Sequence, residues 1–132
     1  MRKTVSKYLF LILAALLLSG CCYFVPCHPA TYITGVVIDG VSNQAIPEAA
    51  VRLYYYQTHT TSMGCFSIGG ADAPPFEFGV SAPGYKPVVV KAVRGFYRAK
   101  VVLMPESSVG ESTSNFIEIS HNQFTELSQS CL

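Results

Sequence analysis

The sequence predicts an all-β fold, a small seven-stranded antiparallel β-sandwich that follows a cleaved N-terminal signal helix. Short runs rich in β-branched and aromatic residues recur at intervals of about 8–12 residues. Turn-forming pairs such as Gly69-Gly70, Pro74-Pro75 and Pro83-Gly84 separate these runs. After residue 20, no stretch shows the apolar period that is typical of an amphipathic helix.

The first 20 residues have the order of a secretory signal. Three basic residues, Arg2, Lys3 and Lys7, precede an unbroken apolar run over residues 8–18. This run would rise about 16 Å as a helix, roughly half of the hydrocarbon core, which needs ~20 residues to span. A secretion signal is therefore favoured over a permanent transmembrane helix.

The segment Leu18-Ser19-Gly20-Cys21 resembles the lipobox of bacterial lipoproteins. This resemblance implies cleavage between Gly20 and Cys21 and lipidation of the Cys21 thiol. Two or three acyl chains hold a protein stably on a membrane, whereas one chain binds only marginally. Because Cys22 rather than Asp follows the lipidated residue, the resemblance implies the outer membrane, facing the periplasm. The alternative is an ordinary signal peptide, with Cys21 later joined in a disulfide.

Cleavage would leave 112 of the 132 residues, enough for one domain with a modest core. This part carries six basic and eight acidic residues, so its formal charge is −2. It has no basic patch, which argues against a nucleic-acid partner. Residues 21–31 contain two prolines and no periodicity, so they are interpreted as a lipidated tether. The last 10 residues of this tether, 22–31, could span at most ~35 Å.

Four further cysteines, Cys22, Cys27, Cys65 and Cys131, are candidates for disulfides in an oxidising compartment. Four cysteines allow three pairings, and spacing does not choose among them. A bridge from the C-terminal tail to the N-terminal segment is attractive. Cys27-His28 resembles half of a metal site, but no second pair has ligand spacing, so we expect no metal and no cofactor.

The predicted strands are residues 32–38, 49–56, 65–68, 76–82, 87–93 and 99–104, with a Thr/His-rich turn over 57–63. Alternation sets the expected facing of the side chains. In the second strand, Val51, Leu53 and Tyr55 share one face, and Arg52, Tyr54 and Tyr56 share the other. In the third, Phe66 and Ile68 point inward and Cys65 and Ser67 outward. In the fourth, Phe76, Phe78, Val80 and Ala82 oppose Glu77, Gly79 and Ser81.

Residues 106–132 form a polar C-terminal tail. Residues 106–115 are low in complexity and are expected to be flexible. Residues 116–120 alternate well enough to predict one extra strand that folds back onto the sandwich.

Four segments in order, residues 35–39, 45–53, 64–68 and 81–85, resemble the carboxypeptidase regulatory-like domain. That family is a transthyretin-like (prealbumin-like) Greek-key β-sandwich of seven strands, and the similarity covers about residues 32–105. Gly64 can supply a positive φ before a strand, and Tyr85 could lay its ring over the sandwich edge with its hydroxyl in water. The usual turn glycine is replaced here by Asn43-Gln44-Ala45.

The resemblance implies a non-catalytic domain that supports folding or contacts. The leading hypothesis is a membrane-anchored envelope lipoprotein whose sandwich acts as a structural or protein-interaction module for an unknown envelope partner. The alternative is a carbohydrate- or peptidoglycan-binding module with a ligand surface of Arg52, Tyr54, Tyr56 and His59, because flat rings beside a polar group suit sugar stacking.

A hydrolase is the third hypothesis. A transthyretin-like relative hydrolyses 5-hydroxyisourate with histidines, an arginine and a C-terminal Tyr-Arg-Gly-Ser, whereas this chain ends Gln129-Ser130-Cys131-Leu132. Its histidines, His28, His59 and His121, fall in the tether, a predicted turn and the tail. Flexible segments do not hold side chains with the accuracy that catalysis needs, so we expect no enzyme activity and no catalytic residues.

Overall fold

The computed structural model describes residues 12, 30–70, 76–92 and 94–130. The predicted signal cleavage site, the predicted lipidation site Cys21 and nearly all of the predicted tether lie outside these ranges. The described elements are β1 (Thr31–Asp39), β2 (Ala50–Leu53), β3 (Tyr56–His59), β4 (Cys65–Gly70), β5 (Phe76–Ser81), β6 (Val88–Ala92), β7 (Gly95–Leu103), β8 (Thr113–Glu118) and α2 (His121–Ser130). No helix within the described ranges is both long enough and apolar enough to cross a membrane.

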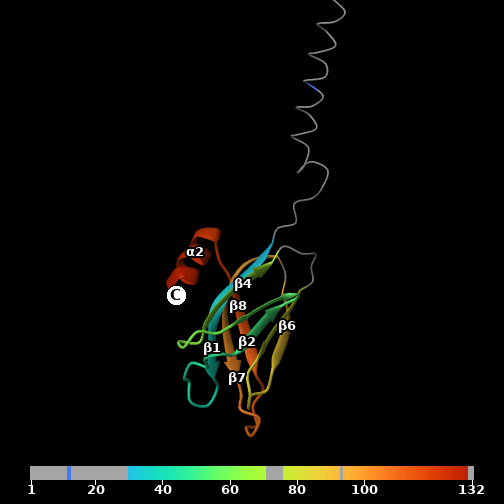
Figure 1. Cartoon of the computed structure of the whole chain (residues 1–132). Helices are drawn as coiled ribbons and strands as arrows, with labels where there is room; N and C mark the ends of the chain where they lie inside the picture. Colours follow the sequence, from blue (N-terminus) through green and yellow to red (C-terminus); the bar gives the residue numbers. More distant parts are fainter. Residues whose placement is uncertain (1–11, 13–29, 71–75, 93, 131–132) are drawn as a thin grey trace, which may run out of the picture.

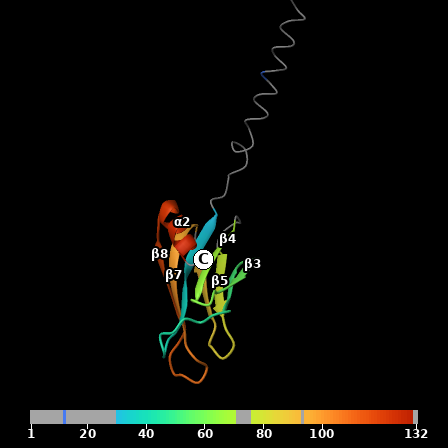
Figure 2. The same ribbon diagram turned by 60° about the vertical axis from the view of Figure 1, so that its left-hand side comes forward.

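The strands form two four-stranded sheets, which make the molecule a mostly-β sandwich (Figures 1 and 2). Sheet A has the strand order β4-β1-β7-β8, and sheet B has the order β3-β2-β5-β6. All pairs are antiparallel except β1 and β7, which run parallel at the centre of sheet A. The prediction of a purely antiparallel sandwich is therefore wrong at this pair. A long crossover through sheet B separates β1 from β7, and such a crossover allows parallel pairing.

The core lies between the sheets and is built by period-2 alternation on both inner faces. Phe66, Phe78 and Phe116 form its aromatic centre, with ring centroids 5.8 Å apart for the first pair and 5.3 Å for the second. The buried apolar residues are Ile33, Val37, Ile46, Ala49, Val51, Leu53, Phe66, Ile68, Phe78, Val80, Val88, Ala99, Val101 and Leu103. The inward facing predicted for Phe66, Ile68, Phe78 and Val80 is confirmed.

The single strand predicted over residues 49–56 is wrong, because the chain turns back at Tyr54-Tyr55. Leu53 pairs with Tyr56 across this turn, and β3 then runs where a Thr/His-rich turn was expected. Tyr54 has a φ of 55°, which reverses the chain direction. As a result Tyr55 does not face the core with Val51 and Leu53; its side chain is 80% exposed.

The tail forms a strand and a helix, and the expectation of no helix after residue 20 is wrong at α2. Ser120 and Gln123 make a capping box at its start. The Gln123 N–H donates to Ser120 Oγ (3.2 Å), and the Ser120 N–H donates to Gln123 Oε1 (3.0 Å). The strand β8 pairs with β7 and includes residues 113–115, which had been assigned to a flexible segment.

The loop between β7 and β8 is held by Lys86. Its ammonium donates to the carbonyl oxygens of Ser108 (2.9 Å) and Gly110 (2.8 Å). The neighbouring Tyr85 hydroxyl does not point into water as expected; it donates to Asp39 Oδ2 at 2.7 Å. The predicted positive φ of Gly64 is confirmed at 74°, and Asn43, with a φ of 57°, takes the backbone role of the missing turn glycine.

Candidate ligand surface

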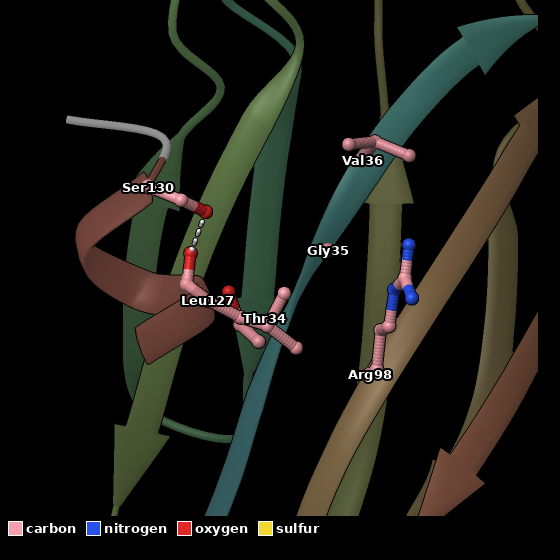
Figure 3. Close-up of a pocket in the computed structure, with 6 residues that line it drawn as sticks. All are labelled: Thr34, Gly35, Val36, Arg98, Leu127 and Ser130. Atoms are coloured by element: carbon pink, nitrogen blue, oxygen red, sulfur yellow. Dashed lines mark hydrogen bonds between the residues drawn. The ribbon is translucent and has the colours of Figure 1, made fainter. Parts of the chain in front are cut away.

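The helix α2 lies over part of the outer face of sheet A, where it contacts β1 and β7 (Figure 2). Thr34 points outward from β1 but is only 3% exposed, and its hydroxyl donates to the Phe66 carbonyl oxygen (3.1 Å). Leu127 and Ser130 of the helix face Thr34 across a crevice of about 140 Å³ (Figure 3). This volume suits small molecules such as water better than a drug-sized ligand. The crevice is therefore a packing seam.

The outer face of sheet B also presents exposed side chains. Arg52, Glu77 and Lys91 are exposed there, and Val89 is 64% exposed. The register sets Arg52 of β2 opposite Gly79 of β5, and Gly79 opposite Val89 of β6. One row across the three strands therefore consists of the cationic Arg52, Gly79 without a side chain and the apolar Val89.

This row lies beside a depression of about 230 Å³, which we call the sheet B groove: Arg52, Tyr54, Glu77, Gly79 and Val89. Gly79 leaves the groove open, since a Cβ built there would meet no atom closer than 3.7 Å. The missing side chain therefore makes room for a ligand without being needed for strand packing. Tyr54 is tied to the groove through its backbone, because its N–H donates to the Glu77 carbonyl oxygen (3.1 Å).

Tyr54 holds a strained backbone. Its φ of 55° is in the left-handed region, which costs a residue with a bulky side chain about 1–2 kcal/mol. Its ring lies 3.9 Å from that of Tyr55, and the two hydroxyls are hydrogen-bonded at 3.1 Å. Strain of this kind persists where the surrounding structure enforces it, and such positions cluster at functional sites.

The structure brings together two of the four residues predicted to form the ligand surface. Arg52 and Tyr54 line the sheet B groove. Tyr56 points elsewhere, because its ring lies over Gly70 of β4, where a Cβ would fall 2.0 Å from Tyr56 Cε2. His59 lies at the far end of β3 and lines a separate depression with Cys65 and Ser128. The β2–β3 turn therefore separates Arg52 and Tyr54 from Tyr56 and His59.

The sheet B groove also contains three residues outside the predicted ligand surface, namely Glu77, Gly79 and Val89. The alternation in residues 76–82 already placed Glu77 and Gly79 on the outward face. What it could not supply is the strand order, which puts β5 between β2 and β6 and so sets these residues beside Arg52.

The remaining predicted site residues divide by position. Cys65 takes part in a disulfide, whereas Cys21, Cys22, Cys27 and Cys131 lie outside the described residues, as does His28. His59 belongs to sheet B, and His121 begins α2 with its ring 5.1 Å from that of Phe96. Within the described ranges, no three His, Cys, Asp or Glu side chains are grouped so that they could hold a metal ion.

Comparison with known proteins gives no family. No protein-family model matches the chain, and no curated protein sequence matches it. Among solved structures, a candidate membrane-associated protein of unknown function from Bacteroides fragilis is similar over 64% of this chain, with a TM-score of 0.48 and 22% identity. The 3-chlorocatechol 1,2-dioxygenase of Rhodococcus opacus 1CP is similar over 70% of the chain, with a TM-score of 0.40 and 9% identity.

The chain spans 31% of the length of the first of these proteins and 61% of the second. Similarity at these scores assigns no activity or ligand to it. The described residues form a β-sandwich of two four-stranded sheets with one C-terminal helix.

Proposed function

We propose that this chain is a membrane-anchored envelope lipoprotein whose sandwich is a non-catalytic module that binds another envelope protein through the sheet B groove. The observation that carries the proposal is Tyr54, a strained and 48% exposed aromatic residue beside the open floor at Gly79. The resemblance to the carboxypeptidase regulatory-like domain supports the same role, since that domain accompanies other proteins rather than reacting with a substrate.

The chemistry of the groove suits a protein partner. Tyr and Arg are enriched among residues that dominate protein interfaces, and Tyr54 and Arg52 lie together here. Val89 adds exposed apolar surface, while Glu77 and Lys91, which face each other between β5 and β6, supply a polar rim. An apolar and aromatic centre with a polar border is the usual anatomy of a binding surface.

Site-specific photo-crosslinking in the intact envelope tests this surface. A photoreactive residue in place of Val89 should give a discrete cross-linked product, and Arg52→Ala in the same chain should reduce its yield several-fold. The matched control places the same photoreactive residue at Lys100, an exposed position on β7 of the other sheet. Equal products from both positions, or none from Val89, would contradict the proposal.

The lipid anchor can be tested separately. The lipobox resemblance assigns acylation to Cys21 and a position at the outer membrane, with the sandwich within ~35 Å of the bilayer. Metabolic labelling with an alkyne-bearing fatty acid should label the wild-type chain, and Cys21→Ser should remove the label. The control variant Cys22→Ser should keep it. A label that survives Cys21→Ser would rule out this anchor.

A glycan is the second candidate ligand, favoured by the Tyr54 ring beside the bare backbone at Gly79. Sugars stack on flat rings, and an open floor lets a pyranose approach. Isolated sacculi should then retain the purified domain, and Tyr54→Ala should abolish the retention. Gly79→Ala should also reduce the retention, because the added Cβ meets no atom closer than 3.7 Å in the fold but occupies the floor of the groove. Sacculi that bind none of these proteins exclude this candidate.

The positions of the two described histidines support the non-catalytic role. His59 lies on β3 of sheet B, and His121 starts the helix that packs on β1 and β7 of sheet A. Purified protein is expected to show no turnover of 5-hydroxyisourate above the uncatalysed rate. Turnover that is lost in a His59→Ala, His121→Ala double variant would establish the hydrolase instead.

A further inference from the structure

We propose that the free edge of β8 binds an extended, acidic segment of a partner protein as an added strand of sheet A. β8 is the last strand of this sheet, and within the described ranges it pairs with β7 alone. The strand β6 of the other sheet contacts β8 but does not pair with it. This surface is separate from the sheet B groove, so the inference goes beyond the proposed function.

The backbone of β8 directs hydrogen-bonding groups away from β7. The Ile119 N–H donates to the Phe96 carbonyl oxygen (2.8 Å), and these two residues continue the antiparallel register of the pair. Because backbone groups alternate in direction along a strand, those of Ser114, Phe116 and Glu118 face the free edge. None of these groups bonds to another backbone group of the described residues. An added strand can therefore pair with all three residues.

The β8 edge lacks the features that usually block such pairing. Proteins protect edge strands by making them short, by bulges, or by placing Lys or Pro in them. In sheet B, β3 has only four residues and β6 contains Lys91. β8 has six residues and no Pro, and its one charged residue, Glu118, is the last. Its register with β7 is unbroken, and Ile117 is 63% exposed. This edge is therefore suited to strand addition.

The charge beside this edge favours an acidic segment. The register sets Arg98 opposite Ile117 and Lys100 opposite Asn115. These four residues line a depression of about 320 Å³, and none of the four is acidic. Two strand spacings, about 10 Å, separate β7 from an added strand. Side chains of an added strand that stand opposite Asn115 and Ile117 share their face of the sheet, so a carboxylate there meets the long basic side chains.

The position of the acidic side chain along the added strand also follows from the charges. Glu118 and Glu126 line the neighbouring depression at the α2 side, together with Ile117. The surface is therefore less positive toward α2 and more positive toward Lys100. We expect the acidic residue of the partner opposite Asn115, and an apolar residue opposite Ile117.

Binding of a defined peptide to the purified full chain in detergent tests this surface. The probe is a fluorescent heptapeptide, Thr-Val-Thr-Glu-Thr-Val-Thr, in which Glu and both Val share one face of a strand. Fluorescence anisotropy should show saturable binding, at least ten-fold weaker when Lys replaces the Glu of the peptide. Two further versions carry N-methyl groups on alternate amides, one version for each edge of the extended peptide. Only one of them should lose binding, because only one edge of the peptide faces β8.

Variants of the protein test the same contact from the other side. Glu118→Pro removes an N–H from the free edge and should weaken binding at least ten-fold. Glu118→Thr is the matched control, because it loses the same charge but keeps the N–H, and it should bind like wild type. Lys100→Glu should reverse the preference between the Glu and Lys peptides. The peptide comparisons use the wild-type chain alone, so they stand even where a variant fails to fold.

Three outcomes would overturn the inference. The probe might not bind at all, or both N-methylated versions might bind as well as the parent, which would indicate a merely cationic surface. The third is a dimer in sedimentation that Glu118→Pro dissociates, since a second copy of the chain would then occupy the edge.

The two proposed surfaces are tested apart. A strand held at β8 lies near Lys100, so a photoreactive residue at Lys100 would then give a product whose mass differs from that of the Val89 product. Peptide binding without a Val89 product refutes only the proposed function, and a Val89 product without peptide binding refutes only the added strand.

Discussion

At the scale of single residues, Asp39 at the end of β1 organises the loops at one end of the sandwich. Its Oδ1 accepts hydrogen bonds from the N–H groups of Val41 (2.7 Å) and Ser42 (3.0 Å), and its Oδ2 accepts one from the Tyr85 hydroxyl (2.7 Å). The bond from Ser42, and then those from Tyr85 and Val41, lower the pKa of Asp39 below its usual 3.8, while desolvation opposes them. The same contact raises the pKa of Tyr85.

This pair predicts an acid-sensitive contribution to stability. Because the pKa of Asp39 is lower in the folded chain, its contribution is present above about pH 4 and is lost as the pH falls through the folded pKa. Tyr85→Phe should lower the free energy of unfolding near pH 7, and the difference from wild type should shrink below pH 4. Urea unfolding at a series of pH values measures this.

The control for this experiment is Tyr97→Phe. The Tyr97 hydroxyl donates to the Arg94 carbonyl oxygen (2.9 Å), and burial, followed by the charge of Glu118, raises its pKa above 10. Tyr97→Phe should therefore change the free energy of unfolding by the same amount at pH 7 and at pH 3. A constant difference for Tyr85→Phe over that interval would show that the bond to Asp39 does not stabilise the fold.

Two serines near β8 predict opposite effects on stability. Ser114 Oγ is buried, and within the described ranges it has no hydrogen-bond partner. Ser112 Oγ accepts from the Met104 N–H (2.9 Å) and donates to the Lys86 carbonyl oxygen (2.6 Å). Ser114→Ala should raise the free energy of unfolding by about 1 kcal/mol, and Ser112→Ala should lower it by a similar amount. Chemical denaturation compares the two, and equal effects would contradict this prediction.

At the scale of elements, the β2–β3 hairpin couples strain to the proposed ligand surface. Glycine takes a positive φ without cost, so Tyr54→Gly should keep or raise the free energy of unfolding, by up to about 1 kcal/mol. The same change should reduce the yield of the Val89 cross-link or the retention on sacculi. Tyr55→Gly is the control, because Tyr55 does not line the groove. If Tyr54→Gly loses stability and keeps binding, the tyrosine serves the turn and not a ligand.

Local sequence signals explain why some elements were predicted and others were not. In β5 the alternation runs without interruption, so the facing of Phe78, Val80, Glu77 and Gly79 could be read from the sequence. Residues 49–56 contain no Gly or Pro at the turn, so the sequence has no turn signal that predicts the β2–β3 hairpin. The positive φ of Tyr54 is imposed by tertiary contacts, because the intrinsic backbone preference of tyrosine does not favour it. The groove depends in turn on strand order, which local patterns do not encode.

The helix α2 did carry a signal, in the capping box Ser120–Gln123 and the spacing of Phe124 and Leu127. Ten residues form only a marginal helix in water, so its stability must come from docking on sheet A. Ser120→Ala should therefore destabilise the helix by about 1 kcal/mol and increase amide exchange over residues 121–130. The exposed Asn122→Ala should leave exchange nearly unchanged. Equal exchange in both variants would argue against the cap.

At the scale of the whole molecule, the two outer faces are unequal. The helix α2 packs on β1 and β7 of sheet A (Figure 1). Sheet B instead carries the groove that Tyr54, Arg52 and Val89 line. The strand β1 begins beside the aromatic contacts among Tyr32, Phe96 and Phe124. Cys21 precedes Thr31, the first residue of β1, by ten residues. The lipid anchor proposed at Cys21 would therefore hold this end of the sandwich toward the bilayer.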